Sequence, residues 1–217
     1  MANSRFVLAY CLENKVQAQA IDQQLSPSGL VFDHLSCGEG AENAFSYRLT
    51  QASDPIVLLL SDNLLKSIHC MDNLYSAVQQ LLRNRRLTTI VIDGVEVSEH
   101  GALAPRTTRF DRVSHVIQYM NYWQDKYLEA RKEKRDIPEE EEAAFNDRLK
   151  TIRSISSDIG EFLRFLRNSD YYHYEKLAEN DFNGFFTVLQ IEQLRSAYLS
   201  SSMSGKNAMA AAISSVA

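Results

Sequence analysis

Glycine and proline are scarce in this sequence, which has eight glycines and four prolines in 217 residues and no glycine before residue 29. Flavodoxin-type and dinucleotide-binding sites need a Gly- or Thr-rich turn after the first strand, where a phosphate can approach backbone amides. The first 28 residues contain no glycine for such a turn. This absence excludes phosphate sites of that type at the first turn.

Cysteines and long apolar runs are also few. Cys11, Cys37 and Cys70 are an odd number without a CxxC pair, which predicts free thiols in a reducing cytoplasm. His34 and Cys37 lack a second pair of ligands, so no metal site is assigned.

No run reaches the roughly 20 apolar residues of a membrane span. With a net charge of −5 and no extended basic block, we expect neither a membrane nor a nucleic-acid partner.

Five short apolar segments predict the strands of a sheet. Three of them are near-continuous apolar runs, which is typical of strands covered on both faces. The segments are RFVLAY (5–10), LVFDHL (30–35), PIVLLL (55–60), LTTIVID (87–93) and HVIQYM (115–120). Segments with helical spacing alternate with them, so right-handed crossovers and a doubly wound sheet follow. The predicted fold class is α/β, with a five-stranded, mainly parallel, flavodoxin-like sheet and helices on both faces.

The helices between the strands are predicted from apolar residues three or four apart. In residues 13–25 the expected stripe is Val16, Ala20, Ile21 and Leu25. In residues 41–53, Phe45 and Leu49 repeat at four, and residues 70–84 carry a similar stripe from Leu74 to Leu82. After the fifth segment, residues 121–136 are expected to form a helix with Trp123 and Tyr127 facing inward.

A C-terminal helical extension is predicted over residues 138–196, after a domain formed by residues 1–135. Pro138 breaks the chain, and four glutamates at 139–142 suit the positive end of a helix dipole. The apolar stripe of this helix is Phe145, Leu149, Ile152, Ile155, Ile159, Phe162, Leu163 and Leu166. It could pack on the α/β domain, on residues 174–194, or in a helical dimer or connector to a further C-terminal domain. Residues 197–217 are expected to be a flexible tail.

Ligands of such sheets bind at the carboxyl ends of the strands, so the residues after each strand are the candidates for a site. A phosphate-accepting receiver domain would have paired acids after its first strand. This chain has YCLEN there, with Glu13 as its one acid, so that class is excluded.

The order of several motifs resembles the Toll/interleukin-1 receptor (TIR) domain family, particularly its bacterial members, over about residues 4–135. FVLAYCLEN matches the first strand and turn, and FDHLSCGEGAENAF matches the second strand and its loop, with Gly38 or Gly40 and then Phe45. SDPIVLLLSDNLLKSIHCMDNL matches the third strand, which ends in Ser61, and the family's Ser-x-x-Cys-x-x-Glu-Leu arrangement, here Ser67 to Leu74.

The resemblance implies a candidate site for NAD, which many TIR domains cleave at the nicotinamide–ribose bond. Its cleft would include Tyr10, Cys11, Ser61 and Asn73, and Asn73 occupies the position of the family's catalytic glutamate. An amide carries no charge to stabilise an oxocarbenium-like ribose, and losing about 3–4 kcal/mol would slow cleavage by two to three orders of magnitude.

Other carboxylates could supply the missing charge. Asp72 precedes Asn73 and is the first alternative catalytic position, but one residue on a regular helix is a rotation of about 100°. Glu13 and Glu39, in the first and second loops, are further candidates. His69 and Cys70 are adjacent on a predicted helix, where neighbouring side chains point apart, so they are not expected to form a nucleophile–base pair.

The resemblance also implies an interaction loop, SCGEGAENAF (36–45), through which TIR domains dock onto one another. Its residues Cys37, Gly38, Glu39, Gly40 and Phe45 are the candidates for contact, and Glu42 adds charge. We therefore expect a TIR-like assembly module that binds itself or another TIR domain, with no cofactor beyond NAD as a ligand or substrate. The alternative is a TIR-type NAD glycohydrolase that uses Asp72 or a loop carboxylate.

Overall fold

The computed structural model describes residues 5–38, 44–97, 103–134 and 138–200. Its centre is a five-stranded sheet in which every pairing is parallel, in the order β2-β1-β3-β4-β7. The strands are β1 (Arg5–Cys11), β2 (Val31–Cys37), β3 (Ile56–Leu60), β4 (Leu87–Val91) and β7 (Tyr171–His173). The predicted α/β fold with a flavodoxin-like sheet is confirmed.

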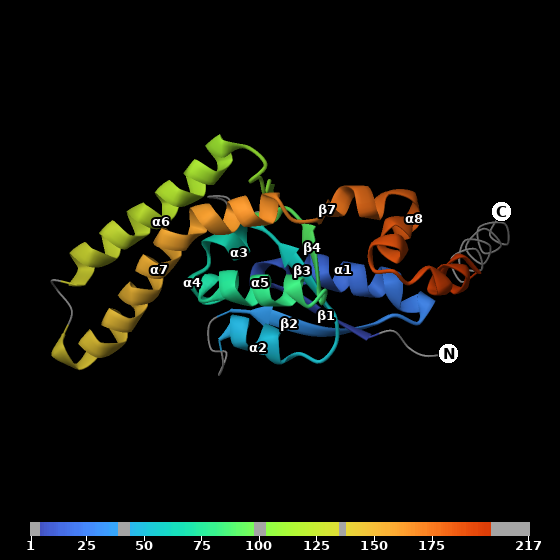
Figure 1. Ribbon diagram of the computed structural model, residues 1–217, viewed down its shortest axis with the longest axis horizontal. Coiled ribbons are helices and arrows are strands. Elements are labelled where there is room, and N and C mark those ends of the chain that lie inside the picture. The colour runs from blue at the N-terminus through green and yellow to red at the C-terminus, as the bar shows by residue number, and fades with distance from the viewer. Residues whose placement is uncertain (1–4, 39–43, 98–102, 135–137, 201–217) are drawn as a thin grey trace, which may run out of the picture.

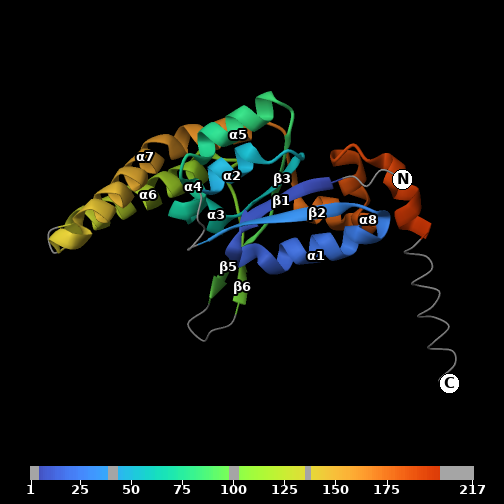
Figure 2. The same cartoon turned by 90° about the horizontal axis from the view of Figure 1, so that it is seen from below.

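Helices cover both faces of this sheet (Figures 1 and 2). Alternate residues of β1 point to opposite faces: Val7, Ala9 and Cys11 enter one core, and Phe6 and Leu8 enter the other. On the second face lie α1 (Lys15–Leu25) and α8 (Tyr174–Val188). The first face carries α2 (Phe45–Gln51), α3 (Asp62–Lys66), α4 (Ile68–Met71), α5 (Leu74–Arg83), α6 (Val113–Glu133) and α7 (Glu142–Arg167).

The prediction of a fifth strand at residues 115–120 is wrong, because this segment lies inside α6. Val116, Tyr119 and Trp123 are its buried residues, and their spacing of three and four is helical rather than alternating. The actual fifth strand is β7, which continues the sheet beyond β4. It pairs in parallel with β4, from Tyr171 opposite Thr89 to His173 opposite Val91. β7 has three residues and no apolar run, so the sequence contains no strand pattern at this position.

Two details of the predicted helices also differ. Val16 is 71% exposed, and α1 instead buries Ala18, Ile21 and Leu25. The predicted continuous helix over residues 70–84 is two helices, because α4 ends at Met71 and α5 begins at Leu74. Asn73 lies between them in the left-handed region, at φ 54°.

The long helix predicted after Pro138 is confirmed as α7, preceded by a 3-10 turn at Glu139–Glu141. Its apolar stripe is buried against α6 and the α/β domain rather than in a contact with a second chain; Tyr75 of α5, for example, packs on Phe162 at 5.5 Å between ring centroids. Residues 174–194 lie on the other face of the sheet and do not cover it. Residues 192–200 are helical, and the ring of Tyr198 packs on Phe186.

A two-stranded antiparallel hairpin stands apart from the main sheet. It is formed by β5 (Gly94–Val97) and β6 (Leu103–Arg106), and it projects beside the carboxyl ends of the central strands (Figure 2). Because the hairpin follows β4 directly, Arg106 at its end and Thr108 just after it lie near the carboxyl ends of β1 and β3, where both contact Asp62.

Candidate functional site

The strand order reverses between β1 and β3, which is where doubly wound sheets hold their ligands. Asn14, just after β1, and Ser61, just after β3, meet there and have no exposed surface. The Ser61 hydroxyl donates to Asn14 Oδ1 at 2.6 Å, and Asn14 Nδ2 donates to the Asp93 carbonyl at 3.0 Å. Ser61 Oγ also accepts from the Leu64 amide as the N-cap of α3. Ser61 therefore holds three strand exits together and cannot touch a ligand.

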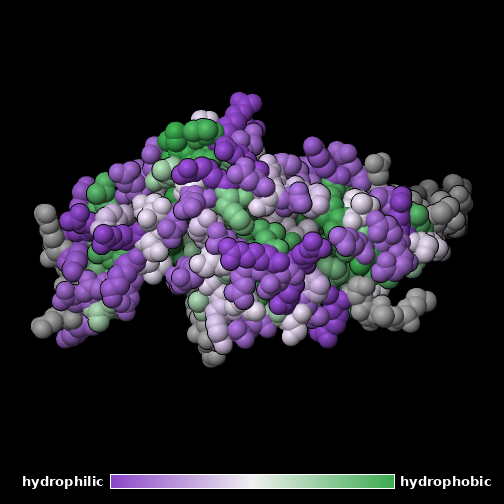
Figure 3. Space-filling view, in the orientation of Figure 1, coloured by the Kyte–Doolittle hydropathy of each residue, from purple (hydrophilic) through white to green (hydrophobic). Residues whose placement is uncertain are grey.

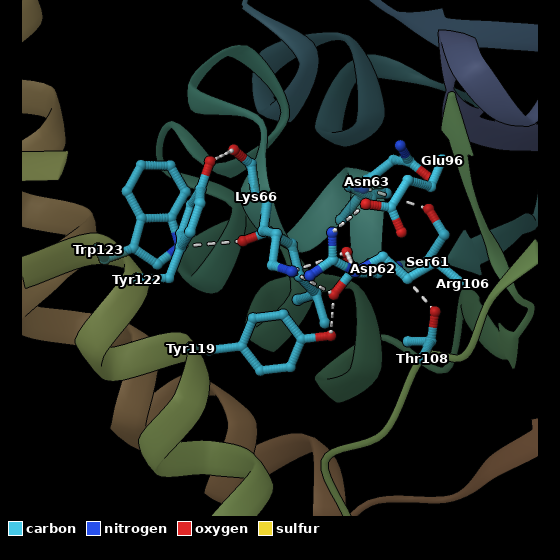
Figure 4. Close-up of polar contacts among 12 residues, drawn as sticks. Ser61, Asp62, Asn63, Lys66, Glu96, Arg106, Thr108, Tyr119, Tyr122 and Trp123 are labelled. Atoms are coloured by element: carbon cyan, nitrogen blue, oxygen red, sulfur yellow. Dashed lines mark hydrogen bonds and ion pairs between the residues drawn. The ribbon is translucent and has the colours of Figure 1, made fainter. Parts of the chain in front are cut away.

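Asp62 lies next to this junction and is the centre of an ion-pair cluster with Lys66, Arg106 and Tyr119 (Figure 4). Lys66 Nζ lies 2.9 Å and Arg106 Nε 3.0 Å from its carboxylate, and the Tyr119 hydroxyl donates at 2.9 Å. Its backbone amide donates to Thr108 Oγ1 at 2.7 Å. The Asp62 side chain is 8% exposed, so two cations compensate a charge that has lost most of its water.

Aromatic residues of α6 complete this arrangement. Lys66 Nζ lies 5.6 Å from the ring centre of Tyr119 and 5.4 Å from that of Tyr122, both within cation–π range. The Tyr122 hydroxyl donates to the Lys66 carbonyl, and Trp123 Nε1 donates to the Leu65 carbonyl. These bonds satisfy carbonyls at the end of α3, where the helix itself has no donors. Burial, together with the charge of Asp62, raises the pKa of the Tyr119 hydroxyl far above its usual range.

A cleft of about 920 Å³ opens over this cluster. Arg106, Lys66, Lys126 and Arg148 bring positive charge to it, and Glu13, Asp62 and Glu96 bring negative charge. Its remaining lining is Asn63, Ser67, Ile68, His69, Val95, Tyr122 and Trp123. Cations can bind phosphate groups and a carboxylate can accept from ribose hydroxyls, so the cleft has groups suited to a nucleotide.

Glu13 is the acid that the structure brings to this cleft from the predicted loop candidates. Its carboxylate accepts from the Cys11 thiol at 2.8 Å, and its side chain is exposed. Unlike Asp62, it has no ion-pair partner within 4.0 Å among the described residues. It is therefore the carboxylate there with the greatest freedom to meet a ligand.

The three cysteines lie close together under the carboxyl ends of the strands and are all free. Cys11 and Cys37 are opposite each other in β1 and β2, and the Cys70 thiol donates to Cys11 Sγ at 3.5 Å. The contact with Cys70 and burial raise the pKa of the Cys11 thiol, and burial raises that of Cys70. These two thiols stay protonated, so neither is a nucleophile at neutral pH. His69 is exposed, on the other side of α4 from the buried Cys70.

The predicted catalytic positions lie outside this cleft. Asn73 is exposed at the start of α5, and its Nδ2 donates to Asp72 Oδ1 at 3.0 Å. With Asp72 it lines a narrow pocket against α7, of about 40 Å³. The predicted cleft of Tyr10, Cys11, Ser61 and Asn73 is not assembled: Tyr10 points to the opposite face, where its hydroxyl meets His34 Nδ1 at 3.2 Å.

The predicted interaction loop is anchored at both ends. Cys37 and Phe45 are 2% and 3% exposed, so they belong to the core rather than to a contact surface. Gly38 is partly exposed, while Glu39, Gly40 and Glu42 lie outside the described residues. A pocket of about 390 Å³ joins the two anchors to Asp72; it is lined by Cys37, Gly38, Ala44, Phe45, Arg48, Ile68, His69, Asp72, Asp147, Arg148 and Thr151.

Sequence reasoning missed four residues that make the site: Asn14, Asp62, Arg106 and Tyr119. Asp62 had a usable signal, because it directly follows the serine that ends a buried strand. Arg106 had none, since its hairpin was not predicted, and Tyr119 was assigned to a strand. Their contacts with Asp62 span 44 and 57 positions of the chain, beyond any local pattern.

Within the part of the chain that the structure describes, no group of His, Cys, Asp and Glu could hold a metal ion. In the same residues, every helix is too short or too polar to cross a membrane. Comparisons with protein-family models, with curated proteins and with solved structures give no match for this chain.

Proposed function

We propose that this chain is a TIR-like assembly module of a cytoplasmic signalling or defence protein. It would bind a second copy or another TIR domain through residues 36–45. The cytoplasmic assignment is supported by three cysteines that remain free although they lie together.

The observation that carries this proposal is the state of Asp62. A catalytic carboxylate must be able to change its interactions with the reacting ribose. Asp62 is instead neutralised by Lys66 and Arg106 and accepts from Tyr119, with 8% of its side chain exposed. Asn73, at the family's catalytic position, is an exposed amide that donates to its neighbour Asp72. Both arrangements support a structural rather than a chemical role.

The buried anchors of the loop are the second support. Cys37 and Phe45 fix both ends of the segment at the edge of the sheet where the strands finish. A short segment held in this way can present its polar residues to a partner at a small entropic cost of ordering. The glutamates at 39 and 42 would then supply charge for recognition.

Charge reversal in the loop tests the assembly. The Glu39→Lys/Glu42→Lys protein is expected to lose concentration-dependent species larger than a dimer in sedimentation velocity. A matched control is Glu140→Lys/Glu192→Lys, which makes the same change in net charge at two exposed positions outside the loop. Equal assembly by the two variants would count against docking through the loop, as would a wild type that never exceeds a dimer.

A TIR-type NAD glycohydrolase is the second candidate, and the position of Glu13 favours it. This carboxylate shares the 920 Å³ cleft with Lys126, Arg148 and Arg106, which could hold the phosphates of NAD. The test is nicotinamide release by concentrated protein, with Glu13→Gln and Asp72→Ala in parallel. The assembly proposal expects no turnover above buffer. Turnover that disappears in Glu13→Gln and persists in Asp72→Ala would establish the enzyme instead.

A further inference from the structure

Two thiols that the candidate site does not use are in contact with each other. The Cys70 thiol, on α4, donates to the sulfur of Cys11, at the end of β1, at 3.5 Å. At this distance the two sulfurs touch, and a disulfide would bring them to about 2.05 Å. Both side chains belong to the core of the first face, as does Cys37, and each of the three is at most 2% exposed. Figure 3 shows a mainly hydrophilic surface, and these cysteines lie beneath it.

Cys11 is better placed than Cys37 to bond with Cys70. Cys11 and Cys37 lie opposite each other on paired parallel strands. Adjacent strands are about 4.8 Å apart, which is wider than the roughly 3.8 Å between the Cβ atoms of a disulfide. By contrast, α4 has only four residues, and its amino end is held by Ser67 Oγ, which accepts from the Cys70 amide at 3.3 Å. The left-handed Asn73 follows it. A single turn between two breaks can shift Cys70 toward Cys11 without disturbing the sheet.

The carboxylate of Glu13 supplies a proton acceptor for Cys11. Its Oε2 accepts from the Cys11 thiol at 2.8 Å, and its exposed side chain lines the 920 Å³ cleft, from which a small oxidant can approach. Burial and their mutual contact keep the pKa of each thiol raised, so free thiolate is scarce at neutral pH. Glu13 can take the proton of Cys11 while its sulfur attacks, so no free thiolate has to form first.

We propose that Cys11 and Cys70 are a redox-sensitive pair, which hydrogen peroxide converts into a disulfide beside the candidate cleft. In the first step the Cys11 sulfur attacks one peroxide oxygen and the O–O bond breaks. The thiol proton passes through Glu13 to the leaving oxygen, which departs as water and leaves a sulfenic acid on Cys11. In the second step the Cys70 sulfur attacks that of Cys11, the S–O bond breaks, and the hydroxyl leaves as water with the Cys70 proton. Two thiols lose two electrons in total, and one peroxide becomes two waters.

The disulfide changes the cleft as well as the core. Cys11 then has no S–H to donate, so Glu13 becomes a free carboxylate in the cleft that also contains Lys126 and Arg148. The bond joins residues 59 positions apart, so it restricts the unfolded chain and stabilises the fold. A small thiol reverses it by exchange. This inference rests neither on docking through residues 36–45 nor on NAD cleavage.

Peptide mapping tests the bond. Protein that is treated with hydrogen peroxide, alkylated under denaturing conditions and digested should yield a linked pair of peptides that contain Cys11 and Cys70, and dithiothreitol should separate them. Cys37→Ser, the same change at the third buried cysteine, is the matched control and should form the bond as the wild type does, whereas Cys11→Ser should not. A linked pair that includes Cys37, oxidation to sulfinic acid without a link, or three alkylated thiols after treatment would overturn the inference.

The rate of bond formation tests the part of Glu13. Glu13→Gln keeps the size of the side chain but cannot take the proton, so the disulfide should form about tenfold more slowly or less. Glu96→Gln, a change at another exposed acid of the cleft, is the control and should react as the wild type does. Equal rates in the two variants would contradict proton transfer to Glu13. Neither assembly nor nicotinamide release enters these measurements, so failure here is distinguishable from failure of the proposed function.

Discussion

The side chain of Asp62 connects three elements at the edge of the sheet where the parallel strands end. One carboxylate joins α3 through Lys66, the β5–β6 hairpin through Arg106 and α6 through Tyr119. Each of these groups would be costly to bury alone, and the cluster neutralises them together. Because these three groups already engage its carboxylate, Asp62 stabilises the fold and is not available for catalysis.

Replacing Asp62 with Asn should lower the free energy of unfolding by about 3 kcal/mol, because two cations then lose their counter-charge. This loss is near the lower end of the range for breaking a buried ion pair, because the Arg106 side chain is 45% exposed and remains partly hydrated. Urea titration measures the change. Asp125→Asn, an exposed acid of the same surface, is the control and should stay within about 0.5 kcal/mol. A similar loss in both variants would argue against a special role for Asp62.

The buried thiols and Tyr119 predict a decline of stability at alkaline pH. An unfolded cysteine loses its proton near its ordinary pKa of 9.0, whereas the folded Cys11 and Cys70 have raised pKa values. Below pH 9 both states are protonated and the stability is complete; above it only the unfolded state ionises, so the free energy of unfolding falls. Above pH 9 each thiol contributes about 1.4 kcal/mol per pH unit, and Tyr119 adds a similar amount above pH 10.0, where the unfolded tyrosine ionises.

Urea midpoints from pH 7 to 11 measure this decline. Cys70→Ala should reduce its slope, although the variant starts from a lower stability because of the cavity that it creates. A slope that is unchanged in Cys70→Ala would show that other groups control the alkaline transition.

At the scale of elements, the side chain of Asn63 attaches the β5–β6 hairpin at a second point, beside the ion pair of Arg106 with Asp62. Asn63 Nδ2 donates to the Val95 carbonyl at 2.9 Å, and Asn63 Oδ1 accepts from the Val95 amide at 2.6 Å. The amide of Asn63 thus pairs with β5 as a neighbouring strand would. Gly94 permits this approach, since a Cβ there would lie 2.6 Å from Asn63 Oδ1.

Asn63→Ala should release the hairpin, because Val95 loses both hydrogen bonds, at a cost of about 1–3 kcal/mol. Amide hydrogen exchange over β5 and β6 should become faster, and Arg106 should leave Asp62 with it. Gly94→Ala is expected to have the same effect from the other side of the contact. Asn121→Ala, on the exposed side of α6, serves as control. Unchanged exchange in the hairpin of the Asn63 variant would contradict the attachment.

At the scale of the molecule, the segment after Pro138 completes the α/β domain. β7 adds the fifth strand, α8 places Phe185 and Phe186 in the core of the second face, and α7 covers Tyr75 of α5 on the first. Two large apolar cores therefore depend on residues far apart in the chain. The fold follows the order expected for a doubly wound sheet, with α6 and α7 inserted between its fourth and fifth strands.

A fragment of residues 1–135 should fail to fold, because it exposes both of these faces and leaves the edge of β4 that pairs with β7 open. We expect a circular dichroism spectrum with reduced helix and strand signals and no cooperative thermal transition, in contrast to the chain of residues 1–200. A cooperative transition in the short fragment would show that the extension is an independent addition.

The sequence predicted best where a pattern repeats over several residues. β1, β3 and β4 were recognised as apolar runs, and the α7 stripe was read correctly because its steps of three and four persist over several turns. Val16 was misplaced because the short α1 allows two overlapping stripes, and packing selects the one with Ala18. Asn73 was expected on a continuous helix, but the backbone breaks at that residue.

The sequence by itself determined the class of the protein: periodicity reflects which side of each element is apolar, and burial of those sides on both faces of a sheet leaves few arrangements. Tertiary structure alone decided the site. Ser61 meets Asn14 across 47 positions, and Asp62 meets Tyr119 across 57. Such contacts depend on which strands are neighbours and on how far each helix extends. Local sequence patterns do not encode either property, because the energy of these contacts is shared by segments that meet only in the folded chain.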